Sequence, residues 1–203
     1  MRTAGLLVAV SMTLAGAPRV ESNVIYGMYS GLALLMEVYH PEKPNGYGVV
    51  FISGSGWHAL QEYSAEPLSK GPQGKLYAPK LAEAGYVVFS IAHRAAPRFR
   101  YPTAVEDAQR AVRFVRHNAA RFGIRAERIG VVGGSSGGHL ALMLGLMDGK
   151  ELADDGDAVN RESAKVQCVV ARAAPADLGA WWRRFRSAER RSVAAPSLPR
   201  ARP

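Results

Sequence analysis

The sequence is poor in cysteine and in long apolar runs. Cys168 is the single cysteine among 203 residues, which excludes a disulfide framework and any multi-cysteine zinc or iron–sulfur site. No apolar run reaches the ~18 residues of a membrane-spanning helix. No pair of histidines has a metal-ligand spacing such as H-E-x-x-H. Because Cys168 stands in an apolar run, we expect it to be a buried core residue.

Acidic residues are also scarce, with 17 Asp and Glu against 26 Lys and Arg and a net charge of +9. The imbalance is concentrated in residues 183–203, where Glu189 is the one acid and the arginines are Arg183, Arg184, Arg186, Arg190, Arg191, Arg200 and Arg202. A basic tail can meet nucleic acid or anionic lipid. A solvated, disordered terminus is the simpler interpretation, and no nucleic-acid partner is expected.

The first 17 residues have the features of a secretory signal peptide. Arg2 supplies a positive start, residues 4–14 are mostly apolar, and Ala15-Gly16-Ala17 has the small-x-small form of a cleavage site. Pro18 is an awkward neighbour for cleavage, and a buried first helix is the alternative. The segment predicts a secreted or periplasmic protein.

The body of the chain alternates short apolar runs with helical patterns. The expected strands are residues 23–27, 32–40, 48–52, 86–91, 129–132 and 166–171, and the expected helices lie around 76–84, from 103 and at 139–147. Strands that alternate with helices at this spacing imply a doubly wound, mainly parallel α/β sheet led by two antiparallel strands. We therefore expect one domain over residues 23–182.

The clearest helix is expected to begin at Thr103. Thr103 and Glu106 have the T-x-x-E spacing of a capping box. Gly123 stands where a C-terminal cap belongs. Between them, apolar residues recur at steps of three and four to form one stripe: Val105, Ala108, Val112, Val115, Ala119 and Phe122.

Residues 133–138, Gly-Gly-Ser-Ser-Gly-Gly, join an expected strand to an expected helix. This is the setting of a nucleophile elbow, G-x-S-x-G, in which a tight turn projects a serine hydroxyl at a helix N-terminus. Ser135 and Ser136 both satisfy the pattern, and spacing alone does not choose between them. A phosphate-binding loop is disfavoured because no Lys follows, whereas a plain turn stays open.

A second loop of small residues, Ser53-Gly54-Ser55-Gly56-Trp57, directly follows the expected strand 48–52. Small residues allow backbone N–H groups to approach a carbonyl oxygen, which is the task of an oxyanion hole. An ordinary Ser/Gly loop is the alternative. Its place before the elbow favours the catalytic interpretation.

Together these segments resemble the secreted esterase and lipase branch of the α/β-hydrolase fold, which includes acetyl-xylan and feruloyl esterases and relatives of hormone-sensitive lipase. The resemblance runs from about residue 24 to 178 and rests on residues 48–57, 86–90, 101–108 and 128–141. The family elbow commonly reads G-x-S-A-G-G-H-L. This register implies that Ser135 is the nucleophile and that backbone N–H groups near Ser55, Gly56 and Ser136 form the oxyanion hole.

The sequence departs from the family at two places. Ser53 and Ser55 replace His and Gly of the family's H-G-G-G-W loop. Beyond residue 171 no histidine occurs, although the family places its acid and its catalytic His there, and Asp177 matches a position other than the triad acid. The five histidines are His40, His58, His93, His117 and His139, and each is expected to be structural or solvated, with His139 directed away from the pocket.

The resemblance implies a serine hydrolase that cleaves small-molecule or carbohydrate esters by acyl transfer, without cofactor or metal. The absent triad positions predict a fold incomplete at its C-terminal edge and a chain of low activity. A truncated or frame-shifted product would explain the tail. The alternative from another class is a remnant or binding module that keeps the pocket and lacks a base.

Overall fold

The computed structural model describes residues 17–60, 62, 65–153, 155–180 and 183. The expected signal peptide, residues 1–17, and the expected tail, residues 183–203, fall almost wholly outside this range. The signal peptide and the tail stay predictions. The predicted limits of the domain between them, residues 23–182, also stay a prediction.

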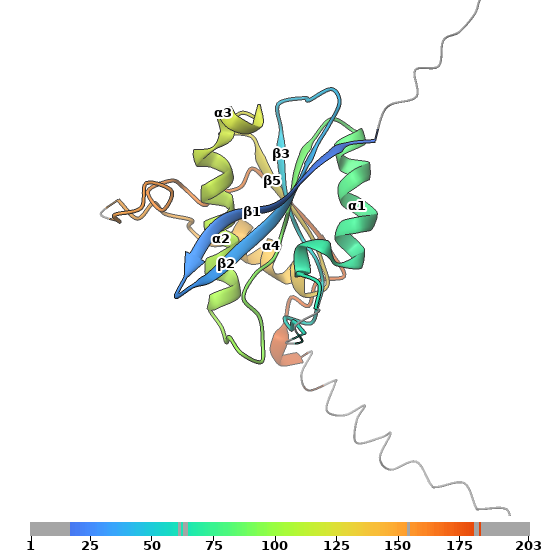
Figure 1. Cartoon of the computed structure of the whole chain (residues 1–203). Coiled ribbons are helices and arrows are strands. Elements are labelled where there is room, and N and C mark those ends of the chain that lie inside the picture. Colours follow the sequence, from blue (N-terminus) through green and yellow to red (C-terminus); the bar gives the residue numbers. More distant parts are fainter. Residues whose placement is uncertain (1–16, 61, 63–64, 154, 181–182, 184–203) are drawn as a thin grey trace, which may run out of the picture.

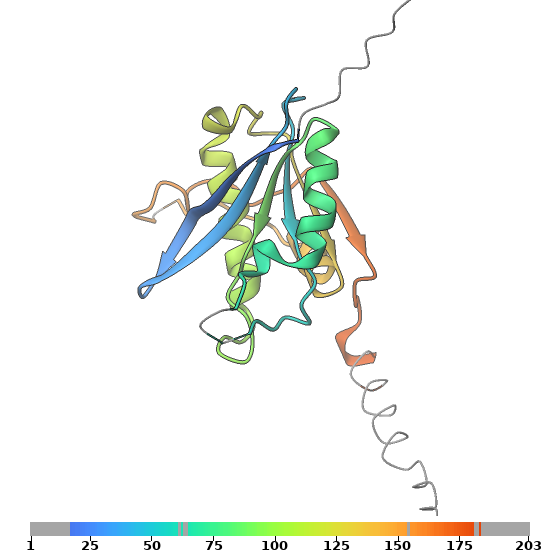
Figure 2. The same cartoon turned by 45° about the vertical axis from the view of Figure 1, so that its right-hand side comes forward.

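Six strands and four α-helices form the described fold (Figures 1 and 2). In chain order these elements and one 3-10 turn, η1, are β1 (Arg19–Tyr29), β2 (Leu32–His40), β3 (Gly48–Ile52), η1 (Leu68–Lys70), α1 (Pro72–Glu83), β4 (Val87–Ile91), α2 (Thr103–His117), α3 (Ala119–Phe122), β5 (Ile129–Gly134), α4 (Ser136–Leu146) and β6 (Cys168–Arg172).

The strands form one sheet in the order β1-β2-β4-β3-β5-β6. β1 pairs antiparallel with β2, and β2 pairs antiparallel with β4. β4, β3, β5 and β6 are parallel to one another. The mainly parallel, doubly wound sheet led by two antiparallel strands is confirmed. The carboxyl ends of β3, β4 and β5 therefore meet at one edge, where ligands bind in open α/β sheets.

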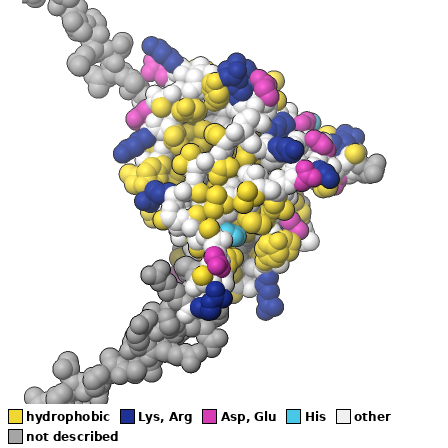
Figure 3. Space-filling view, turned by 180° about the vertical axis from the view of Figure 1, so that it is seen from behind, with side chains coloured by type: hydrophobic (Ala, Val, Ile, Leu, Met, Phe, Trp, Pro, Cys, Tyr) yellow, Lys and Arg dark blue, Asp and Glu magenta, His cyan; other side chains and the backbone are white. Residues whose placement is uncertain are grey.

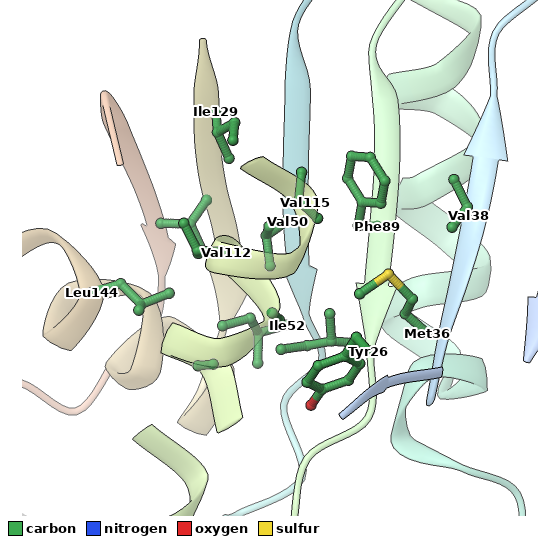
Figure 4. Packing of buried hydrophobic residues seen from close by; sticks show 14 of the residues in the cluster. Tyr26, Met36, Val38, Val50, Ile52, Phe89, Val112, Val115, Ile129 and Leu144 are labelled. Atoms are coloured by element: carbon green, nitrogen blue, oxygen red, sulfur yellow. The ribbon is translucent and has the colours of Figure 1, made fainter. Parts of the chain in front are cut away.

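Helices cover both faces of the sheet, but unequally. On one face, called the α2/α4 face below, buried residues of α2, α3 and α4 pack on β3, β4 and β5 in a large cluster that contains Val50, Phe89 and Val112 (Figure 4). On the other, called the α1 face, Phe51 and Val88 meet Ala78 and Ala82 of α1 in a small cluster. Neighbouring strand residues thus alternate between the faces, as the pleat requires.

The helix boundaries differ from the predicted ones. α1 begins at Pro72 and α4 at Ser136, each several residues before the expected start. The predicted capping box is wrong, because Thr103 is the first helical residue and the preceding Pro102 makes no side-chain cap. The predicted single helix is two helices that break at Asn118. Gly123 does end the second helix, with a left-handed φ of 66°.

β6 corrects the expectation for Cys168. The strand lies at the edge of the described sheet and pairs only with β5. Its residues alternate between exposed and half-buried, and the Cys168 thiol is exposed. Val170 is 55% exposed. The view from behind shows hydrophobic side chains spread widely over that side of the molecule (Figure 3).

The connection from α4 to β6 is held by arginines of α2. Arg113 donates to the carbonyls of Glu162 and Lys150. Arg116 donates to the carbonyls of Ser163, Lys165 and Ala126. Arg110 binds the side chains of Asn160 and Asp157. These guanidinium groups fix a segment that has little regular structure of its own.

Candidate active site

Ser135 stands at the turn between β5 and α4 in a strained conformation. Its φ of 53° and ψ of −124° are rare for a residue with a side chain. Two backbone hydrogen bonds hold it: the Ser135 N–H donates to the Arg172 carbonyl at 2.8 Å, and its carbonyl accepts from the His139 N–H at 3.0 Å. Strain that the surroundings impose on one exposed serine is a feature of functional sites.

The glycines around this turn fit the register centred on Ser135. A Cβ added at Gly133 would lie 2.2 Å from the Gly137 carbonyl oxygen. One added at Gly137 would lie 2.1 Å from the carbonyl oxygen of Ile52 at the end of β3. The positions two before and two after Ser135 must therefore lack side chains, because backbone fills the space on both sides.

The two neighbouring serines have opposite environments. Ser135 is exposed, whereas Ser136 is 1% exposed. The Ser136 hydroxyl oxygen accepts a hydrogen bond of 2.9 Å from the N–H of Ser55 in the loop after β3. Only Ser135 therefore presents a hydroxyl to solvent.

The loop of residues 53–57, called the small-residue loop below, lies directly against the elbow. A Cβ at Gly54 would lie 2.9 Å from that of Ser135. The Gly54 N–H donates to the side-chain oxygen of Gln73 in α1 at 3.0 Å. Sequence reasoning missed Gln73, and no motif marks it; the adjacent glycines Gly54 and Gly134, which leave room for its amide, are the only signal.

The donors predicted for an oxyanion hole are not equivalent. The Ser55 N–H is occupied by Ser136. The Gly56 N–H has no hydrogen-bond partner within the described residues. The Ser136 N–H is the first of α4, where helix geometry supplies no intrahelical acceptor. The N–H groups of Gly56 and Ser136 are thus the two available donors.

The loop after β4 lies beside the small-residue loop. His58 and Ala96 form a parallel bridge, and the Ala96 N–H donates to the Trp57 carbonyl. This second loop is anchored by Arg94, whose side chain makes hydrogen bonds of 2.6 to 3.0 Å to the fully buried Asp107. The guanidinium also stacks on the Tyr29 ring at 4.0 Å.

All five histidines lie within the described residues, and no imidazole among them is hydrogen-bonded to the Ser135 hydroxyl. His40 pairs with Glu21, His117 with Glu162, His58 with the Gly56 carbonyl and His93 with the Arg94 carbonyl, whereas His139 packs on the Trp57 ring. The structure brings Ser135 and Ser136 together with the small-residue loop that carries Ser55 and Gly56. It places no base against them among these residues.

Burial lowers the pKa of three of these imidazoles. It lowers the pKa of His93, outweighing the hydrogen bond to the Arg94 carbonyl. It lowers the pKa of His139, and also that of His40 despite the hydrogen bond to Glu21. The Nε2 of His93 and the Nδ1 of His139 are buried and have no hydrogen-bond partner in the part of the chain that the structure describes.

Two cavities flank the elbow. One of about 300 Å³ is lined by Trp57, Phe99, Tyr101 and His139 among others; His139 thus borders a cavity beside the elbow, and its predicted direction away from the catalytic pocket stays a prediction. The other, of about 270 Å³, lies between α1 and the β5–β6 edge and is lined by Phe51, Tyr77, Gly134 and Val170 among others. Ser135 stands in sequence between the residues that line the two.

Within the described ranges, no group of three or more His, Cys, Asp or Glu side chains is placed to hold a metal ion. The helices of these ranges include none long and apolar enough to cross a membrane.

The sequence model of the BD-FAE family matches residues 36–199. The chain belongs to the BD-FAE family. Esterase LipC of Mycobacterium tuberculosis is 34% identical over 129 residues, which are 61% of this chain and 29% of that protein. Carboxylesterase NlhH of the same species is 30% identical over 129 residues, or 62% of this chain and 37% of the relative.

A solved structure described as a truncated form of a carbohydrate esterase from gut microbiota shares the fold of this BD-FAE chain. It has a TM-score of 0.63 and 26% identity, and the match covers 82% of this chain and 60% of that one. The α/β-hydrolase esterase fold and family predicted from the sequence are confirmed. The chain spans less than two fifths of the length of LipC and NlhH, and the family match extends into the segment predicted to be a tail.

Proposed function

We propose that this BD-FAE chain carries the nucleophile half of a carboxylic-ester hydrolase, with Ser135 as the attacking residue. The supporting observation is the exposed Ser135 hydroxyl on a strained turn, between two glycines whose places admit no side chain. Esterase relatives that match the same segment make ester hydrolysis the chemistry to test.

In the proposed reaction the Ser135 oxygen attacks the ester carbonyl and gives its proton to solvent water. The carbonyl oxygen becomes an oxyanion beside the N–H groups of Gly56 and Ser136, at the positive end of the α4 dipole. Collapse expels the alcohol, which takes up a proton, and leaves an acyl-serine. Water then releases the acid and restores the serine hydroxyl.

Within the described residues no imidazole is placed against the Ser135 hydroxyl. No imidazole there takes up the serine proton during attack, so we expect the attack to be slow. Positioning and oxyanion binding alone leave about 10³–10⁴-fold acceleration over water in other serine hydrolases. The same observation favours the second candidate, a binding module that keeps the pocket without turnover.

A serine-directed fluorophosphonate separates the two candidates. Labelling of the purified chain, located on Ser135 by mass spectrometry and lost in Ser135→Ala, supports the esterase. Ser69→Ala, which removes a buried hydroxyl on η1, is the matched control and should label as wild type. No labelling at Ser135 would favour the binding module.

Turnover of a short-chain nitrophenyl ester is expected to stay well below the ~1 s⁻¹ of ordinary enzymes. A Ser135-dependent rate at or above that value would contradict the expectation and assign the role of base to one of the five histidines. His58 and His93, which follow β3 and β4 at the active edge of the sheet, would then be the first to replace.

Small-molecule or carbohydrate esters are the proposed substrates, supported by the carbohydrate esterase among the similar structures. Residues 1–17 support export as a further proposal. Expression with a reporter fused after residue 30 would test it, because cleavage near residue 17 and reporter activity outside the cytoplasm are both expected.

A further inference from the structure

The hydrogen bond from the Ser55 N–H to the Ser136 hydroxyl joins two segments that are 81 residues apart. One is the small-residue loop, and the other is the residue that follows the proposed nucleophile. The acceptor oxygen belongs to a side chain that is 1% exposed. The Ser55 N–H is therefore directed at a buried acceptor and not at solvent.

This contact gives the Ser136 side chain a task that the family pattern lacks. The family commonly has Ala here, which offers only its backbone N–H. In this chain the hydroxyl and the Gln73 amide oxygen accept from two consecutive N–H groups, those of Ser55 and Gly54. Two tethers at adjacent residues fix the peptide that leads into Gly56.

We infer that the Ser136 hydroxyl is a positioning residue for the oxyanion site: it holds the Ser55 N–H inward and thereby fixes the next peptide, whose Gly56 N–H is left free for the oxyanion. The inference rests on the proposed function. It alters the predicted donor set, because Ser55 acts through its anchored backbone and Gly56 and Ser136 provide the N–H groups that meet the oxyanion.

The consequence is that the rate of attack by Ser135 should be sensitive to substitution of Ser136, although the Ser136 side chain is buried. Removing the hydroxyl leaves the Ser55 N–H buried without its acceptor, so the loop must shift to satisfy it. A shift of about 1 Å in a group that stabilises a transition state can cost 10²-fold in rate. The fold itself should remain, because Gln73 still holds Gly54.

The test compares Ser136→Ala and Ser136→Cys with Ser69→Ala. Ala removes the acceptor and its volume, whereas Cys keeps most of the volume but offers sulfur, a weak acceptor. We expect both Ser136 variants to lower the second-order rate of fluorophosphonate labelling at Ser135 at least tenfold, and Ser69→Ala to leave it unchanged. Amide hydrogen exchange should rise at least tenfold at Ser55 in both variants, and stay unchanged at Gly54.

A purely structural role would slow labelling only as far as it unfolds the chain, so melting temperatures are measured on the same samples. Unchanged or faster labelling in Ser136→Ala would overturn the inference and leave the proposed function intact. A slow Ala variant beside a normal Cys variant would assign the effect to volume, and would also overturn it. Wild-type chain that fails to label at Ser135 would overturn the proposed function and the inference with it.

Discussion

The two faces of the sheet differ in how they are stabilised. On the α2/α4 face, three helices bury a continuous cluster from Val24 on β1 to Leu144 on α4, together with the fully buried Asp107. On the α1 face, the buried cluster has five residues, two of them on α1 itself, and a cavity of about 270 Å³ lies beside β6. The site lies between them, because α4 carries Ser136 and α1 carries Gln73.

This difference shows which parts of the site depend on global stability. The elbow packs into the well-covered face, so its strained turn is held by the whole cluster. Gln73 contacts the small-residue loop from the sparsely covered α1 face, where fewer buried residues hold its helix. We therefore expect substitutions that remove buried side chains to lower the free energy of unfolding more on the α2/α4 face than on the α1 face.

The largest contrast should come from ion pairs. Asp107→Ala would leave Arg94, among the described carboxylates, with the exposed Glu106 at 3.8 Å. Breaking a buried pair costs about 3–5 kcal/mol of unfolding free energy. On the α1 side, Lys75 pairs with Glu66, and both side chains are more than half exposed. Glu66→Ala should cost far less, because solvent screens an exposed ion pair.

Urea denaturation of both variants, with the wild type as reference, measures this contrast. Equal losses would show that the two faces do not differ in the way the burial indicates.

A matched pair of phenylalanines gives the next contrast. Phe89 is fully buried on the α2/α4 face and packs edge-on against Phe122, with ring centroids 4.8 Å apart. Phe51 is 2% exposed on the α1 face, but it borders the cavity. Phe89→Ala should cost about 3–5 kcal/mol, and Phe51→Ala at least ~1 kcal/mol less, because the open groove lets neighbours and water fill the space.

Thermal and urea unfolding report both values. A loss at Phe51 as large as that at Phe89 would mean that the α1 face is closed in solution, by contacts beyond those described.

The smallest effect should be a pH dependence of stability from His93. Burial lowers its pKa in the folded chain, so the unfolded chain binds the proton first. Stability is complete above the unfolded pKa of about 6.5 and is lost as the pH falls from there toward the lower folded value. His93→Asn keeps a donor for the Arg94 carbonyl and removes the titration.

Unfolding free energies at pH 7.5 and 5.5 should therefore differ less in His93→Asn than in wild type. His117→Asn, on an exposed side chain, is the control. A variant whose stability falls with acid as steeply as wild type would exclude His93 as a source of the effect.

Much of the fold could be predicted because its signals are local. The apolar run Gly48–Ile52, bounded by glycines, is β3 to the residue. The elbow was predictable for a similar reason, since tight turns demand glycine at fixed spacings. The sequence left Ser135 and Ser136 equivalent until the family register was applied, and the burial of Ser136 agrees with that register.

The features that the sequence did not predict correctly depend on residues that are remote in sequence. Cys168 lies in an apolar run, yet its exposure is set by β6 being at the sheet edge, which no short window shows. Thr103 has a capping spacing, but the turn that contains Pro102 starts the helix one residue too early for it to act as the cap. The contact between Ser55 and Ser136 spans 81 residues and could not be read from either motif.

The arginines of α2 also help to determine the backbone path of a neighbouring segment. Arg113 and Arg116 grip the α4–β6 connection by its carbonyl oxygens, and every amino acid provides the same carbonyl. The amino acids of that connection can therefore be substituted without a change in its backbone path, provided that the two arginines remain. Lysine, with a single charged nitrogen, could not bridge two such acceptors in the same way. The backbone path of residues 149–165 thus depends in part on side chains of a helix that ends some thirty residues earlier.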